Sequence, residues 1–520
     1  MLPWRVAGLS GGDRTERSTF KFKLGANMLL KTRLLISVAA IAAVSPAIAP
    51  AQAQSISSFT EGDIVVSVEG NGSNTGSYAD NQAAPLTLYE YGSSGTGFVG
   101  SFQLPQTNSG ANFAVSGEYG SSSEGTLQLS GNGRYLTIAG YGVNANAFNA
   151  NPGSYSPDPT NTALAQSGSL TGQSYTAVPR VVALIGQNGS VNSSTALYNV
   201  FNANNPRSAY TVNGTSFYVS GQGDYPDATG GVFYATLGSH SATSIIGADA
   251  GSGTSQDTRE VQVYNGQLYV SSDSKKGSTN RDYIGTLGAQ GALPTSEANG
   301  GNGPAMLPGF GNPGGTGKIT VTAANANNVN AGLIGKNKTV NLSPENYFFA
   351  NADTLYVADS GSPKNTSANS PLGDGGLQKW TLSDGTWTLD YTLSAGLDLV
   401  ANSGTSGSTG LYGLTGKDIT VDGVQEVELF ATNYTIGDTD QTYLYGVSDV
   451  LGDLNAQAGE SFAELEQAPA DATFKGVAFA PAPVPELSTW AMMLLGFVGL
   501  GFAVRQQRQA KAVSPVHRLG

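Results

Sequence analysis

The chain has 520 residues, a formal net charge of −13 and no cysteine. The segment from residue 54 to residue 484 is more acidic, with 35 Asp and Glu residues against 14 Lys and Arg residues. This charge repels nucleic acid and anionic lipid, so neither is an expected partner. No disulfide can form, so the body has to be stabilised by its own hydrophobic core, for which it is long enough.

The N-terminal region predicts export. Lys31 and Arg33 precede an apolar segment, and Ala51 and Ala53 then provide the small residues of a signal-peptidase site. We therefore expect cleavage before Gln54. The residues upstream of the second methionine show no structural pattern, so we interpret them as untranslated or disordered.

The body has the composition of an all-β protein. Charged residues make up only 12% of the chain, which contains 70 glycines. Such a composition disfavours helices and suits many tight turns between short strands. No long segment with a helical period occurs outside the two ends of the chain.

An internal repeat makes the fold prediction more specific. Five segments each predict two strands joined by a tight turn, and Asn213-Gly214 and Asn265-Gly266 are strong hairpin signals because both turn positions require positive φ. The five segments are 126–140, 208–221, 259–273, 346–359 and 418–433. Third strands are predicted at 180–185, 231–237, 282–287, 376–382 and 442–447, and fourth strands at 195–201, 245–246 and 387–393.

The two ends of the body complete the pattern. Segments 63–68, 86–91 and 99–104 predict the second, third and fourth strands of a unit that lacks its first strand, and 474–479 predicts that first strand. Pairing the two termini in one sheet would remove the free sheet edges. Four antiparallel strands per unit resemble the broad class of secreted bacterial β-propellers. The count predicts six blades, with seven as the alternative if a further blade contains 318–322.

A right-handed β-helix or an extended adhesin is the competing architecture, because these proteins are also rich in Gly, Asn and Thr. A shorter period, near 20 residues, would be expected for them, and the sequence contains none.

The long connections of the predicted propeller emerge on one face, which favours a binding surface there, although long loops are also tolerated without a function. They are residues 141–179, 222–230, 274–281 and 360–375, together with the inter-blade stretches 105–124 and 296–341.

Acidic residues in these loops are candidate Ca²⁺ ligands, because Ca²⁺ prefers carboxylate and carbonyl oxygens. The candidates are Asp224, Asp227, Asp273, Asp359, Asp374, Asp438 and Asp440. No ordered calcium-loop motif is present, so solvated carboxylates are the alternative. Three loop tyrosines, Tyr155, Tyr175 and Tyr225, could stack on sugar rings or pack within the structure.

The sequence contains few signs of an enzyme. His240 is the single histidine between residues 54 and 484, and it defines no catalytic triad without geometry. No thiol nucleophile and no zinc motif occur. A pair of glycosidase-type carboxylates remains open, because their spacing is spatial and cannot be read from the sequence. We expect no cofactor other than the Ca²⁺ considered above.

The C-terminal region has three parts. Pro485 and Glu486 are followed by Trp490 and Ala491, then by an uncharged apolar run and a basic cluster that includes Arg505 and Arg508. The uncharged run covers residues 489–504 and would span about 24 Å as a helix, which is short for a membrane but can be accommodated by local thinning. Basic residues after it would hold the C-terminus on the cytoplasmic side and leave the body outside.

This tail resembles the PEP-CTERM sorting signal of Gram-negative bacteria, in the variant with Trp-Ala before the apolar run; the same tail is also labelled an ice-binding protein C-terminal domain. The resemblance implies processing by a membrane-embedded protease of the exosortase type and transient anchoring in the inner membrane. Leu487 stands where a second Pro is usual, which puts the efficiency of processing in doubt. An ordinary tail anchor is the alternative interpretation.

The predicted organisation is an upstream segment (1–27), a signal peptide (28–53), a propeller body (54–480), a sorting signal (481–511) containing the transmembrane helix (489–504), and a tail (512–520). We expect an exported, non-catalytic binding or structural protein of the cell envelope or exopolysaccharide matrix, with a surface glycan as partner. An extracellular glycan hydrolase or lyase is the alternative.

Overall fold

The computed structural model describes most of the predicted body. The described residues are 54–70, 78–224, 227–246, 257–273, 275–276, 279–280, 282–310, 320–322, 339–361, 375–400, 404–484 and 520. The signal peptide, residues 485–511 of the sorting signal with its predicted helix, Tyr225 and Asp374 lie outside these residues. Among the described residues, no helix is long and apolar enough to cross a membrane.

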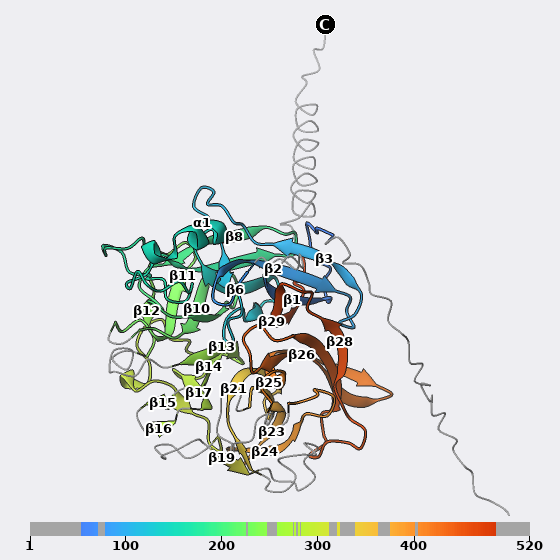
Figure 1. Ribbon diagram of the computed structural model, residues 1–520. Helices are drawn as coiled ribbons and strands as arrows, with labels where there is room; N and C mark the ends of the chain where they lie inside the picture. Colours follow the sequence, from blue (N-terminus) through green and yellow to red (C-terminus); the bar gives the residue numbers. More distant parts are fainter. Residues whose placement is uncertain are drawn as a thin grey trace, which may run out of the picture. The chain divides into compact units, whose positions relative to one another are not determined.

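The body is all-β, as predicted, and its described part contains six groups of four antiparallel strands (Figure 1). The first group, in pairing order, is β29 (Ala472–Phe479), β1 (Ile64–Gly70), β2 (Ala83–Tyr91) and β3 (Phe98–Gln103). The second is β5 (Leu127–Leu129), β6 (Tyr135–Tyr141), β7 (Arg180–Gly186) and β8 (Val191–Leu197). The third is β9 (Pro206–Tyr210), β10 (Ser216–Gly221), β11 (Gly231–Thr236) and β12 (Thr243–Ser244).

The remaining three groups repeat this order. The fourth is β13 (Thr258–Tyr264), β14 (Gln267–Ser272), β17 (Tyr283–Leu287) and β18 (Ala305–Met306). The fifth is β21 (Pro344–Asn351), β22 (Thr354–Asp359), β23 (Gly376–Ser383) and β24 (Thr386–Leu393). The sixth is β25 (Ser408–Val421), β26 (Val424–Thr435), β27 (Tyr443–Val450) and β28 (Ala463–Gln467).

The two ends of the body share one sheet. β29 pairs with β1 in antiparallel register, with Ile64 opposite Phe479 and Val68 opposite Phe474. This confirms the predicted pairing of the termini. A short strand that the sequence did not predict, β4 (Ser116–Glu118), pairs with β2 and bridges to β6, which joins the first two groups into one nine-stranded sheet.

Buried apolar clusters connect each group to the next. Six of them contain residues from two consecutive groups, and the sixth group is connected back to the first. Representative pairs, from the first interface to the last, are Val65 with Leu136, Val182 with Phe217, Tyr218 with Val261, Ile284 with Leu355, Tyr356 with Leu429, and Phe430 with Val66. The first strands contact one another in the same cyclic order: β29, β5, β9, β13, β21, β25 and β29 again. The fold is therefore propeller-like.

The turn chemistry differs between the two strongest hairpin signals. Asn265 (φ 45°) and Gly266 (φ 75°) both have positive φ, as predicted. At the other hairpin only Gly214 does (φ 86°), because residues 211–215 form a longer loop between β9 and β10 in which the Asn213 side chain accepts a hydrogen bond from the Thr215 amide (3.0 Å).

The fourth strands differ most from prediction. β8 begins four residues before the predicted segment, and β12 precedes Ile245 and Ile246. Both isoleucines are fully buried in the core between the third and fourth groups, so they contribute to core packing and not to a strand pair. The segment suspected of hiding a seventh blade contains β19 (Thr320–Thr322), which pairs with β20 (Thr339–Asn341) alone.

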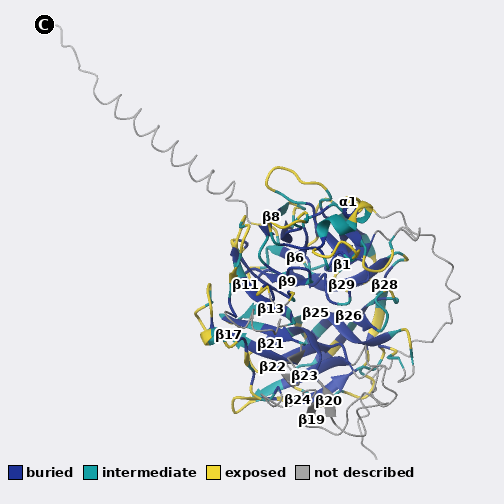
Figure 2. Cartoon of the chain, turned by 60° about the vertical axis from the view of Figure 1, so that its left-hand side comes forward, coloured by how far each residue is buried: buried dark blue, intermediate teal, exposed yellow. Residues whose placement is uncertain are grey.

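Two further short strands and the helical turns lie in connections. β15 (Lys275–Lys276) pairs with β16 (Thr279–Asn280), and a 3₁₀ turn covers Asn299–Gly301. The long connection after β6 contains α1 (Ala145–Ala150) and a 3₁₀ turn at Pro152–Tyr155, packed on a small core of their own. Buried residues concentrate in the strands and exposed residues in the loops (Figure 2).

Candidate functional site

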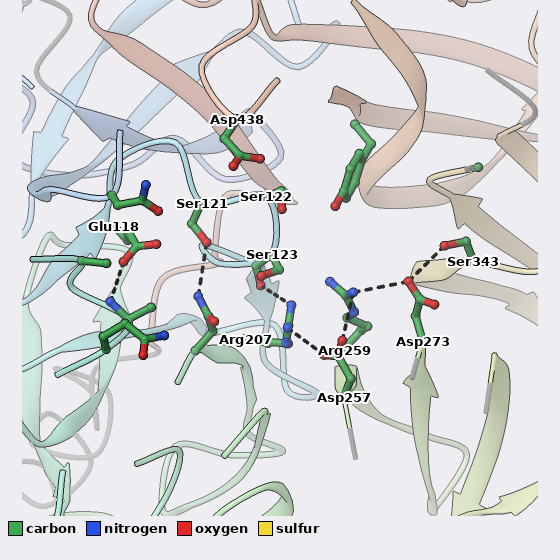
Figure 3. Close-up of a pocket in the computed structure, with 17 residues that line it drawn as sticks. Glu118, Ser121, Ser122, Ser123, Arg207, Asp257, Arg259, Asp273, Ser343 and Asp438 are labelled. Carbon is green, nitrogen blue, oxygen red and sulfur yellow. Dashed lines mark hydrogen bonds and ion pairs between the residues drawn. The ribbon is translucent and has the colours of Figure 1, made fainter. Parts of the chain in front are cut away.

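A polar cavity of about 650 Å³ opens where several first strands begin (Figure 3). Arg207 lies near the start of β9 and Arg259 near the start of β13, while Asn205, Asp257 and Ser343 directly precede first strands. The cavity is therefore built at one end of the first strands, from side chains of neighbouring groups.

The predicted loop face supplies the rest of the lining. Ser121, Ser122 and Ser123 come from the stretch 105–124, and Ala163, Ala165 and Gln166 from the connection 141–179. Asp273, Gly361 and Asp438 follow the second strands of three groups, and Tyr434 lies near the end of one of these strands, β26. Asn81 and Glu118 complete the lining. The structure thus brings together several of the long loops that the sequence assigned to one face.

Two arginines and three carboxylates form a continuous network at the cavity. Arg207 Nη2 lies 2.7 Å from Asp257 Oδ1, and Arg259 Nη2 lies 3.3 Å from both Asp257 Oδ2 and Asp273 Oδ2. Arg259 Nη1 lies 3.1 Å from Glu345 Oε2. Both guanidinium groups are therefore engaged by acidic side chains of this chain.

Burial and charge act in opposite directions on this network. Burial lowers the pKa of Arg259, but the carboxylates of Asp257, Glu345 and Asp273 outweigh it and raise this pKa well above its usual range. Burial raises the pKa of Glu345 to about 7, although Arg259 opposes the shift. Glu345 therefore titrates near neutral pH, whereas an exposed glutamate would not.

A second acidic pair lies at the cavity wall. The Glu118 side chain accepts a 2.5 Å hydrogen bond from the Ala165 amide, and burial, with the charge of Glu124 adding to it, raises the Glu118 pKa well above its usual range. Glu124 accepts hydrogen bonds from the hydroxyl of Tyr141 and from Asn205 Nδ2 (2.5 Å). Burial therefore favours the protonated form of Glu118.

The candidate calcium ligands are dispersed by the structure. Asp273 and Asp438 both line the cavity, whereas Asp359 is fully buried and accepts hydrogen bonds from the Ser343 amide (2.9 Å) and Gln378 Nε2 (2.8 Å). Asp440 accepts from the amides of residues 407 and 437.

The other two candidates with described positions, Asp224 and Asp227, lie in one loop, where the Asp227 amide donates to Asp224 O (3.0 Å) and the Asp227 carboxylate accepts from Asn202 Nδ2. Over the described ranges, no three His, Asp or Glu side chains converge in a group that could hold a metal ion. The calcium site stays a prediction.

The two aromatic candidates with described positions, Tyr155 and Tyr175, do not line the main cavity. Tyr155 packs on Phe148, with ring centroids 5.3 Å apart. Tyr175 lines a second, open cavity of about 400 Å³ and donates to Asn202 Oδ1 (3.3 Å). His240 is exposed and stacks on Tyr198.

Sequence reasoning missed the charged residues at the centre of the cavity. Arg207, Arg259 and Glu345 each occupy the second position of a first strand, in three consecutive groups. In a chain with so few charged residues, a charged residue that recurs at the same position of a repeat indicates a candidate site. An alignment of the repeats by strand position would have found it.

No protein-family model and no curated protein matches the chain. Among solved structures, it is similar to a hypothetical selenium-binding protein from Sulfolobus tokodaii (10% identity, 81% of this chain and 94% of that chain, TM-score 0.36). It is also similar to an oligogalacturonate lyase in complex with manganese (6% identity, 77% and 96%, TM-score 0.31) and to Drosophila Semaphorin 2a (8% identity, 74% and 66%, TM-score 0.30). A likeness at this level carries no argument about what the chain does.

Proposed function

We propose that the protein is an exported, non-catalytic binding protein of the cell envelope or exopolysaccharide matrix, and that its central cavity holds an uncharged, hydroxyl-rich ligand of the glycan class. The single observation that carries this proposal is the charge pairing in the cavity. Arg207 and Arg259 are both engaged by carboxylates of the chain, so neither is a free cation for an anionic ligand.

The remaining lining suits hydroxyl groups. Serine hydroxyls at 121–123 and the amides of Asn81, Gln166 and Asn205 can donate and accept hydrogen bonds. A sugar presents the same mixture of donors and acceptors, and a concave polar site of this size can surround a few sugar rings.

For the architecture, we propose a six-bladed β-propeller in which the strand groups are the blades. The cyclic contacts of the first strands and the shared sheet of the two termini support this count.

For the cellular localisation, we propose a signal peptide at 28–53 and a PEP-CTERM signal with a transmembrane helix at 489–504. Support comes from the sequence motifs, and an exosortase-type protease is the proposed processing partner. Mass spectrometry of the mature protein from its native host is expected to find Gln54 at the N-terminus and a C-terminus before residue 520. An intact C-terminus at Gly520 would contradict the sorting proposal.

One observation favours the alternative, a glycan hydrolase or lyase. Glu118 lines the cavity, its side chain is buried, and burial raises its pKa, which favours the protonated form that a proton donor needs. Both candidate functions involve a glycan ligand, but only the enzyme would convert it into products.

Calorimetry and product analysis on a panel of oligosaccharides separate the two. Saturable binding without new reducing ends or unsaturated products supports the binding protein. Turnover that the Glu118→Gln variant abolishes, while binding persists, supports the enzyme. Gln166→Trp is expected to fill the cavity and abolish binding, and Gln425→Trp, at the exposed β25–β26 turn, is its control. If Gln166→Trp binds as well as the unsubstituted protein, the cavity is not the site.

A further inference from the structure

A sealed ionic cluster lies between the fifth and sixth groups, outside the cavity. Lys379 on β23 and Asp449 on β27 are buried, with 0% and 1% of their side chains exposed. Lys379 Nζ lies 2.7 Å from Asp449 Oδ2 and donates to Val450 O (2.8 Å). An amine is thus held in contact with a carboxyl group, with no access to bulk water.

Two tyrosines hold the carboxyl group of Asp449. The Tyr391 hydroxyl donates to Oδ1 (2.5 Å), and the Tyr356 hydroxyl donates to Oδ2. The rings of Tyr356 and Tyr391 also flank Lys379 Nζ, at 5.7 and 5.8 Å from their centroids. These contacts fix the amine and the carboxyl carbon relative to each other and place hydroxyl donors where a tetrahedral oxyanion would form.

A second acidic side chain completes the cluster. Glu460 Oε2 accepts from the Gln457 amide (2.8 Å), while Glu460 Oε1 is buried and has no hydrogen-bond donor among the described residues. Burial first, and then the adjacent Asp449 carboxylate, raise the pKa of Glu460 to about 7. A protonated Glu460 can lie beside the Asp449 carboxylate without charge repulsion.

From this geometry we propose that Lys379 and Asp449 are joined by an intramolecular isopeptide bond, formed with Glu460 as the proton carrier. The Lys379 ammonium first gives one proton to the Asp449 carboxylate. The neutral amine then attacks Cγ, and the Nζ–Cγ bond forms while the oxyanion is held by the tyrosine hydroxyls. Protonated Glu460 gives its proton to the leaving hydroxyl and takes a second proton from Nζ in its place. The Cγ–O bond breaks, and one water molecule leaves; no oxidant or co-reactant is needed.

The physical reason for the bond is the cost of the charges that it removes. A buried ammonium and a buried carboxylate each lose their hydration, and their attraction often does no more than balance that loss. The amide is neutral. The excluded water slows hydrolysis, and the link would tie two neighbouring groups together in a chain that has no cysteine for a disulfide.

The chain contains a matched pair that should stay unlinked. Lys417 Nζ lies 2.8 Å from Glu428 Oε2, but 38% and 28% of these side chains are exposed. The two pairs have nearly the same separation, so burial and the neighbouring tyrosines and Glu460 are what distinguish them.

Peptide mass spectrometry of the full chain tests the proposal. We expect the peptides that contain Lys379 and Asp449 to be recovered as one branched species, lighter by one water molecule than their sum, and those of Lys417 and Glu428 as unlinked species. Recovery of the Lys379 and Asp449 peptides separately, at their ordinary masses, from the folded unsubstituted protein would overturn it.

Glu460→Gln tests the proton carrier. This variant is expected to fold, as judged by near-ultraviolet circular dichroism, and to lose the branched species almost completely. If it links as fully as the unsubstituted protein, Glu460 is not the carrier. The masses of the Lys379 and Asp449 peptides from the unsubstituted protein decide whether the bond exists, whether or not the Glu460→Gln variant folds.

Discussion

The cavity network and the Lys379 cluster are both buried ionic groups, but they differ in what surrounds them. At the cavity, Arg207 and Arg259 face three carboxylates at the ends of first strands, where loops leave about 650 Å³ of space. Between the fifth and sixth groups, Lys379 and Asp449 lie on third strands and face only protein.

The difference in surroundings determines which of the two ionic groups a ligand can reach. Polar groups at the open ends of strands can hydrogen-bond a ligand that enters from the loops, whereas charges between two packed sheets can interact only with their neighbours. The first arrangement suits binding, and the second suits stabilisation or an internal reaction.

The largest expected effect comes from breaking the sealed cluster. Asp449→Ala removes the partner of a fully buried lysine and of two tyrosine hydroxyls. We expect the free energy of unfolding, measured with denaturant, to fall by about 3–5 kcal/mol. The double variant Lys379→Met/Asp449→Leu, which lacks the link but leaves no unpaired charge, should be more stable than the single variant. A single variant as stable as the unsubstituted protein would show that the pair is not buried in solution.

The next effect concerns pH and the cavity network. Folding raises the pKa of Glu345 from 4.5 to about 7, so the folded state binds more protons than the unfolded state between these values. Stability should therefore fall as pH rises from about 4.5 to 7, by about 3 kcal/mol for this group if the whole shift is realised.

Denaturation at several pH values measures this slope, to which Glu460 contributes in the same direction. The Glu345→Gln variant should show a flatter profile over the same pH range. A slope unchanged by the substitution would contradict the assignment to Glu345.

A smaller effect is expected for ligand binding. Gln166→Ala removes one lining amide and should weaken glycan binding about tenfold, which corresponds to one hydrogen bond. Calorimetry measures the affinity, and the melting temperature should stay unchanged. Gln425→Ala, at the exposed turn between β25 and β26, is the matched control. Equal losses in the two variants would argue against the cavity as the site.

The smallest effect is expected at the exposed ion pair. Glu428→Ala breaks the contact with Lys417, but solvent screens both charges. The free energy of unfolding should change by less than about 1 kcal/mol. A loss as large as that of Asp449→Ala would mean that exposure does not distinguish the two pairs.

Much of the fold could be predicted, because local patterns carry it. Four of the five predicted hairpins coincide with observed strand pairs within one or two residues, and the fifth coincides more loosely with β25 and β26. Alternating apolar residues and turn residues are properties of the sequence itself. Most of the strands that were missed, such as β4 and β18, are two or three residues long and form because a neighbouring strand is already in place. The five-residue β28 was also missed.

For the candidate site, the sequence predicted only that the long loops lie on one face of the propeller, and it did not predict the cavity. The loops that carry Ser121–Ser123 and Gln166 were assigned to it correctly, and two of the candidate aspartates, Asp273 and Asp438, line the cavity. The sequence offered no means to see that Asp359 is buried as a hydrogen-bond acceptor, since this depends on the approach of Gln378 from the next strand.

The sequence alone determined the all-β class and the repeated hairpins, because turn chemistry and strand periodicity are local. The pairing of the two termini followed from the repeat, because the first unit lacks a first strand and the last segment supplies one. The tertiary structure decided which charges meet. Arg207 and Asp257 are 50 positions apart in the chain and lie 2.7 Å apart in the cavity, and Lys379 and Asp449 are brought together across two sheets. Such contacts depend on the packing of whole sheets, which no local pattern specifies.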